Sequence, residues 1–192
     1  MKRHTLLLVG SLAVVLASIT TAVIVGVTRN SDVQGSTATA SCNAPSDLHG
    51  SVVHVAVWDM GHMMGETAMG GGMMTRGDAR PGIMGMQVSS ARVAAGTVSF
   101  VVANVGYITH ELVVLPLKTG SVGQRSVGAD GKVSEAGSLG EASQSCGSGP
   151  GDGLKAETVG WVTLQLPAGR YELICNVPWH YYSGMYAELD VS

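Results

Sequence analysis

A cysteine, a histidine and a methionine stand at even spacing near the C-terminus of the chain, as Cys175, His180 and Met185 with four residues in each interval. A thiolate, an imidazole and a thioether are soft or borderline metal donors, and two histidines, one cysteine and a weak axial methionine form the blue-copper arrangement. That arrangement needs a second histidine. His110 is the candidate, because it directly precedes an apolar stretch at 111–115 that is typical of a strand.

The segments around these donors alternate apolar and polar residues, as half-buried strands do. This alternation predicts strands at 52–58, 97–103, 111–115, 161–166, 171–175 and 185–191. On this prediction Cys175 ends one strand, Met185 begins the next, and His180 lies in the loop between them. Turn residues separate the strands, which favours an all-β domain built as an antiparallel sandwich or barrel.

Two segments resemble the copper-ligand segments of cupredoxins, namely 104–114 (NVGYITHELVV) and 171–185 (YELICNVPWHYYSGM). The C-x₄-H-x₄-M spacing is similar to that of the sulfocyanin and rusticyanin branch. The resemblance covers roughly residues 51–58 and 83–192 and implies a cupredoxin-like Greek-key β-sandwich. It also implies that one type 1 copper ion is bound by four ligands, which are His110, Cys175, His180 and Met185. Cupredoxins of this kind carry single electrons between redox protein partners.

The chain departs from the cupredoxin pattern beside two of these ligands. Trp179 precedes the loop histidine, where relatives often have glycine. Glu111 follows the first histidine, where many cupredoxins have an asparagine or serine that ties the two ligand segments together. The hydrogen bonding around the ligands is therefore expected to differ from that of relatives, and such bonding tunes a metal site.

The N-terminus carries a long apolar run of 23 uncharged residues, Thr5–Val27, preceded by Lys2 and Arg3. This length can span a membrane as a helix, and the two cations favour a cytoplasmic N-terminus. The alternative is a cleaved signal peptide ending near Ala40. Residues 1–28 are thus predicted to be a membrane anchor or a signal segment. Either way the copper domain lies outside the cytoplasm, membrane-anchored in one case and secreted in the other.

Residues 29–50 are small and polar and predict a linker, and residues 51–192 form the predicted copper domain. Cys42 in this linker and Cys146 in the domain remain once Cys175 is taken as a metal donor. A disulfide between them is the economical interpretation, since disulfides persist outside the cytoplasm. Two free thiols, or a lipid on Cys42, are the alternatives.

The copper domain contains two long segments without strand periodicity. The first, 60–82, is a Met-rich loop: with Met84 and Met86 it holds eight of the nine methionines that follow Met1. Thioethers suit Cu(I), so the loop predicts copper acquisition, whereas adaptable apolar packing is the plainer alternative. The second, 116–160, is rich in glycine and serine and predicts one excursion with short strands near Lys132 and Val133.

Composition excludes several classes of protein. Hydrophobic residues at 45% and charged residues at 13% exclude a disordered chain, and a net charge of −3 gives no reason to expect a nucleic-acid partner. The chain is not expected to be an enzyme, because it has no His-x-His pair for a copper cluster and only one cysteine, Cys175, in the ligand loop.

The predicted function is electron transfer at the outer membrane surface, with His180 as the exit for the electron. Three aromatic residues flank it and predict a docking patch or ordinary loop packing: Trp179, Tyr181 and Tyr182. The alternative function is a copper chaperone or storage module that uses the Met-rich loop.

Overall fold

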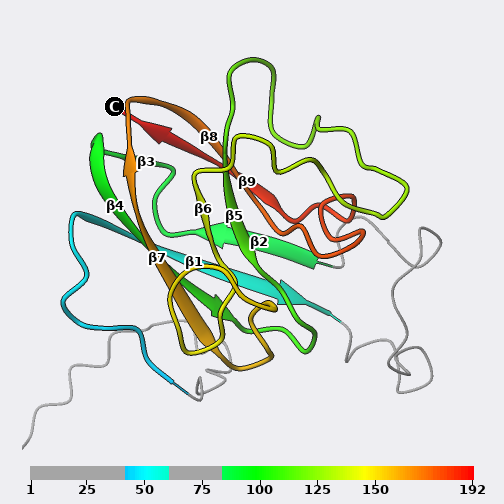
Figure 1. Cartoon of the computed structure of the whole chain (residues 1–192), viewed down its shortest axis with the longest axis horizontal. Coiled ribbons are helices and arrows are strands. Elements are labelled where there is room, and N and C mark those ends of the chain that lie inside the picture. The colour runs from blue at the N-terminus through cyan, green and yellow to red at the C-terminus, as the bar shows by residue number, and fades with distance from the viewer. Residues whose placement is uncertain (1–41, 61–83) are drawn as a thin grey trace, which may run out of the picture. The chain divides into compact units, whose positions relative to one another are not determined.

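The structure is a computed structural model, and it describes residues 42–60 and 84–192 (Figure 1). The predicted anchor or signal segment, most of the linker and nearly all of the Met-rich loop lie outside these residues. Within the described ranges, no helix has both the length and the apolar character needed to cross a membrane.

The described residues form two β-sheets. The first sheet has the strand order β2-β1-β4-β7, and the second has the order β3-β9-β8-β5-β6. The strands, in chain order, are β1 (Ser51–Asp59), β2 (Met84–Val88), β3 (Arg92–Val93), β4 (Gly96–Asn104), β5 (Leu112–Pro116), β6 (Gly140–Ala142), β7 (Val159–Leu166), β8 (Gly169–Ile174) and β9 (Tyr186–Val191). The predicted all-β, two-sheet architecture is therefore confirmed for this part of the chain.

The core lies between the two sheets and is built from alternate residues of each strand. Side chains of β1 and β4 meet those of β5, β8 and β9, and the buried set includes Val53, Val55, Val57, Val98, Phe100, Val102, Leu112, Val114, Leu173, Leu189 and Val191. In a sandwich, every second residue of a strand faces the core, so a sequence that alternates apolar and polar residues buries its apolar side chains there. The inward faces predicted from the sequence are confirmed.

The connectivity brings the ends of several strands to one edge of the sandwich. The chain crosses from the first sheet to the second between β4 and β5, and it returns between β6 and β7. Most strand pairs are antiparallel, as expected, but two pairs, β1 with β4 and β3 with β9, are parallel. Because β1 and β4 run in parallel, both terminate at the end of the sandwich where β5 begins. His110 lies at that end.

The excursion, 116–160, belongs to the sandwich rather than standing apart from it. It contains β6, which pairs with β5, and an isolated bridge joins Val127 to Val133 near the predicted short strands. Leu154 is fully buried in the main core. These contacts place the excursion beside the loops that carry the candidate ligands.

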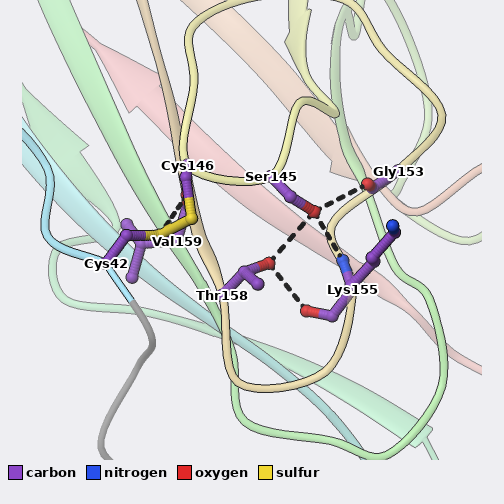
Figure 2. The surroundings of a disulfide bond; sticks show 7 residues. All are labelled: Cys42, Ser145, Cys146, Gly153, Lys155, Thr158 and Val159. Atoms are coloured by element: carbon purple, nitrogen blue, oxygen red, sulfur yellow. Dashed lines mark hydrogen bonds between the residues drawn. A yellow bond between two sulfur atoms is a disulfide. The ribbon is translucent and has the colours of Figure 1, made fainter.

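A disulfide fastens the start of the described chain to the excursion (Figure 2). The bond joins Cys42 to Cys146, with an S–S distance of 2.12 Å, which confirms the predicted pairing. The Cys146 N–H donates to the Val159 carbonyl at 2.7 Å. Next to it, the Ser145 hydroxyl donates to the Gly153 carbonyl at 3.2 Å and accepts from the Lys155 N–H at 2.9 Å. Cys42, where the described chain begins, is thereby held against the edge of β7.

Candidate metal centre

Three of the predicted ligand residues converge at the edge of the sandwich. His110 lies in the crossing before β5, Cys175 directly follows β8, and His180 lies in the loop that leads to β9. All three are buried, and one potential ligand atom from each lies within 4.8 Å of the others. This position follows from the pairing of β5 with β8. The two strands are antiparallel neighbours, so the start of β5 lies beside the end of β8.

The donor atoms face one another closely enough to share one ion. His110 Nδ1 lies 3.1 Å from His180 Nδ1, and Cys175 Sγ lies 3.3 Å from His180 Nδ1 and 3.9 Å from His110 Nδ1. Both imidazoles therefore present the same ring nitrogen to the thiol. Two imidazole nitrogens and one cysteine sulfur in a buried cluster fit the donor chemistry of a type 1 copper ion.

The fourth predicted ligand, Met185, is placed next to these three by the backbone. The Cys175 N–H donates to the Met185 carbonyl at 3.0 Å, and the Met185 N–H donates to the His180 carbonyl at 3.2 Å. Residues 175–185, the ligand loop, thus close on themselves. The Met185 side chain is fully buried in the same apolar cluster as Cys175.

Asp59, which is not among the predicted ligands, contacts the first histidine. Its Oδ2 lies 3.1 Å from His110 Nε2, and both side chains are almost completely buried. A detectable signal existed in the sequence: Asp59 continues the inward-facing series Val53, Val55 and Val57 along β1. An acidic residue at an inward position is uncommon without a partner.

Further hydrogen bonds join the ligand residues to their surroundings. The Glu111 N–H donates to Cys175 Sγ at 3.3 Å, so a backbone amide links the two ligand segments at this residue. The Asn176 amide accepts from the Val133 N–H at 2.8 Å and donates to the Val133 carbonyl at 3.0 Å. The ligand loop is therefore fastened both to the first ligand segment and to the excursion.

Burial governs the protonation of the donors. It raises the pKa of the Cys175 thiol to about 12, with the nearby Glu111 carboxyl adding to the effect. Burial also lowers the pKa of His180 to about 3, helped by the proximity of His110. The His180 imidazole is consequently neutral at physiological pH, as a metal ligand must be.

The aromatic residues beside His180 occupy different environments. Tyr181 is only 2% exposed, and its hydroxyl donates to Glu172 at 2.8 Å and accepts from the Arg125 N–H at 2.9 Å. Tyr182 is 45% exposed and meets Trp179 edge to face at 6.4 Å. Tyr181 therefore belongs to the interior, and for this residue the alternative of ordinary loop packing applies.

Trp179 adopts a backbone conformation that favours glycine. Its φ is 70°, and its N–H donates to the Gly131 carbonyl at 2.7 Å. A Cβ on Gly131 would lie 2.8 Å from the indole ring. Trp179 is thus a non-glycine residue in the left-handed region, and the excursion accommodates its side chain.

Two methionines near the Met-rich loop have structural roles. Met84 is 3% exposed in β2, and Met86 packs against the main core. For these two residues the packing interpretation applies, while Met63, Met64, Met69, Met73 and Met74 lie outside the described residues.

Comparison with known proteins assigns a family to the greater part of the chain. A family model described as the Sulfocyanin (SoxE) domain matches residues 84–192. No curated protein sequence matches the chain.

Solved structures similar to the chain include rusticyanin and auracyanin. Rusticyanin from Thiobacillus ferrooxidans is 15% identical, with 80% of this chain and 88% of that chain covered at a TM-score of 0.41. Auracyanin A, a "blue" copper protein from Chloroflexus aurantiacus, is 16% identical, with 73% of this chain and 98% of that chain covered at a TM-score of 0.40.

Proposed function

The chain belongs to the sulfocyanin family of blue copper proteins, and from this premise we propose that it carries single electrons between redox proteins outside the cytoplasm. The observation that carries the proposal is the buried cluster of His110, Cys175 and His180, whose potential ligand atoms lie within 4.8 Å of one another. A pre-formed buried site suits electron transfer, because little has to move when the charge on the metal changes.

In this proposal the two histidines would hold one copper ion through Nδ1, Cys175 would hold it through Sγ, and Met185 would add its thioether as the weakest donor. Copper held in this way supplies reversible one-electron chemistry. The chain contributes the fixed donor positions and the exclusion of water, since all four residues are buried. Copper loading requires Cys175 to lose its proton, because the thiolate is the form that binds metals.

The electron would leave through His180 and the surface beside it. His180 itself is buried at 2% exposure, whereas Tyr182, two residues further along the same loop, is 45% exposed. Tyr182 and Trp179 lie beside it, and they would form a small apolar contact for redox partners. Weak redox encounters use such small interfaces, which release the partner quickly after transfer.

The proposed location is the outer face of a membrane, with residues 1–28 as the anchor, and secretion after cleavage is the alternative. The Cys42–Cys146 disulfide supports an oxidising compartment. Fractionation of cells producing the full chain tests this: an anchored protein stays with membranes after alkaline washing and keeps its original N-terminus. A shortened chain in the soluble extracytoplasmic fraction would instead establish secretion.

The electron-transfer proposal is tested with the full chain loaded with copper. The oxidised protein should show the intense visible absorption of a copper–thiolate bond and a type 1 EPR signal, and it should accept one electron per chain in a reductive titration. Cys175→Ser should abolish the visible band. A colourless protein that binds only Cu(I) would contradict electron transfer and support a chaperone or storage role.

A matched pair of histidine variants locates the site. His110→Ala should remove the type 1 spectrum, because a donor in the buried cluster is lost. His54→Ala should leave it unchanged, because His54 is exposed on β1 and belongs to no cluster of donors in the described residues. Equal loss in both variants would mean that the spectrum reports on folding rather than on ligation.

A further inference from the structure

Asp59 brings a buried charge from one sheet to a metal ligand that belongs to the other. It is the last residue of β1 in the first sheet, whereas His110 precedes β5 in the second. The Asp59 side chain is 1% exposed and the His110 side chain is fully buried. Burying a carboxylate is costly unless donors satisfy it, so the contacts of Asp59 require an explanation.

Three nitrogen atoms of one short segment, two of them backbone N–H donors, converge on a single oxygen of this carboxylate. Asp59 Oδ2 accepts from the Tyr107 N–H at 2.7 Å and from the Ile108 N–H at 3.2 Å, and His110 Nε2 lies 3.1 Å away. Gly106 leaves room for this approach, because a Cβ there would lie 2.1 Å from the same oxygen. The segment 106–110 is thus wrapped around the carboxylate of Asp59.

This arrangement determines which nitrogen of His110 is available to a metal. A carboxylate only accepts hydrogen bonds, so the proton of a neutral imidazole lies on Nε2. Nδ1 then keeps its lone pair, and Nδ1 is the atom that faces Cys175 Sγ at 3.9 Å and His180 Nδ1 at 3.1 Å. A carboxylate behind a ligating histidine fixes its tautomer and ring orientation and makes it a stronger donor.

We propose that Asp59 is a positioning residue of the metal centre: it holds His110 with Nδ1 toward the ion, and its charge lowers the reduction potential. The charge acts in this direction because a nearby anion stabilises Cu(II) more than Cu(I) in a medium of low dielectric. The inference rests on the proposed copper site but concerns a residue outside the ligand set.

Two substitutions separate the charge from the hydrogen bond. Asp59→Asn keeps an oxygen that can accept from the three N–H groups but removes the negative charge. Asp59→Ala removes both. Glu172→Gln is the matched control, because Glu172 is a fully buried carboxylate that contacts Arg125 and Tyr181 but none of the three clustered donors.

The reduction potential of the copper-loaded full chain tests the charge. Asp59→Asn should keep the type 1 spectrum, weaken Cu(II) binding by about tenfold or more, and change Cu(I) binding less. A tenfold loss of Cu(II) affinity alone would raise the potential by about 59 mV. Glu172→Gln should shift the potential much less. If Asp59→Asn has the parent's potential, or shifts it no more than Glu172→Gln does, the electrostatic role is overturned.

The tautomer of His110 in the metal-free full chain tests positioning without any copper, by ¹⁵N NMR of its ring nitrogens. The parent and Asp59→Asn should carry the proton on Nε2, and Asp59→Ala should give a mixture. An unchanged tautomer in Asp59→Ala would overturn the positioning role, and so would a Nδ1 proton in the parent. If Asp59→Ala does not fold, the parent's tautomer still decides. A parent protein that never turns blue would refute the proposed function instead, leaving this NMR result intact.

Discussion

The two sides of the metal centre are supported in different ways. The outer ring nitrogen of His110, Nε2, contacts one buried carboxylate, Asp59, which reaches it from the opposite sheet, while the His110 backbone is paired with Leu154. The ligand loop, 175–185, rests on many contacts spread along the excursion, at Gly131, Val133 and Arg125. A single charge acts on the electronic properties of the ion, whereas distributed contacts act on the shape of a loop.

This difference predicts different outcomes on the two sides. Changing Asp59 should alter affinity and potential more than stability, since an isosteric amide preserves the packing. Changing the excursion should alter the free energy of unfolding more than the reduction potential. Its contacts hold the backbone and supporting residues of the ligand loop and do not touch the donor atoms. The following variants test the second half of that contrast.

Removing the disulfide should have the largest effect. Cys42 and Cys146 are 104 residues apart, and releasing a loop of this size should lower the free energy of unfolding by about 4.7 kcal/mol. Denaturant unfolding of the double Cys→Ser variant measures this loss, and the visible spectrum of the copper-loaded protein should not change. A shifted spectrum would show that the excursion controls the geometry of the donors, and would contradict the expectation that it mainly affects stability.

Tyr181→Phe should have the next largest effect. Its hydroxyl links the ligand loop to Glu172 and to the Arg125 N–H, so its removal leaves buried polar groups without one partner. We expect a loss of about 2–3 kcal/mol in unfolding free energy. Tyr186→Phe is the control: its ring lies 5.3 Å from that of Tyr181, and we expect a loss below about 0.5 kcal/mol. Equal losses of unfolding free energy in the two variants would mean that the hydrogen bonds of the Tyr181 hydroxyl are not the cause.

Gly131→Ala should cost about 2 kcal/mol, from a left-handed backbone and from contact with Trp179. Gly131 has a φ of 79°, and Gly137 has a φ of 83° with open space around it. Gly137→Ala therefore measures the backbone cost alone, and the difference between the two variants, read from thermal unfolding, measures the contact with the ligand loop. No difference would mean that Trp179 moves aside freely.

The mildest test changes only the pH. The pKa of Cys175 is raised to about 12 and that of His180 is lowered to about 3, so at neutral pH the thiol carries a proton and the imidazole of His180 does not. Binding of copper should therefore release one proton from Cys175 and none from His180. Apparent affinity should rise about tenfold, or 1.36 kcal/mol, per pH unit, as measured by competition with a chelator. An affinity independent of pH would mean that the thiolate is not a ligand.

Much of the fold could be predicted from the sequence because alternation is a local signal. The inward faces of β1 and β4 follow directly from their valines, as Val53 and Val98 illustrate. The strand β6 could not be located, because it is only three residues long and its pairing with β5 joins distant parts of the chain. The parallel pairing of β1 with β4 was likewise invisible, since side-chain alternation is the same in parallel and antiparallel strands.

The candidate site shows the same division. The types and spacing of Cys175, His180 and Met185 predict donors, and the structure gathers His110, Cys175 and His180 into one cluster. The supporting residues are harder to predict, because their roles depend on contacts across the fold. Tyr181 resembles its neighbours in sequence but is buried against Glu172, and Asp59 acts on a residue 51 positions away.

The contact between Asp59 and His110 crosses from one sheet to the other, and it couples the reduction potential of the copper centre to the relative position of the two sheets. If one sheet slid over the other, the carboxylate would move relative to the ring it holds, while the contacts of the ligand loop within its own sheet would move together. Hydrostatic pressure displaces packed layers only slightly, because protein interiors are nearly incompressible. The reduction potential of the copper centre should nevertheless shift continuously with pressure, at pressures well below those that unfold the sandwich.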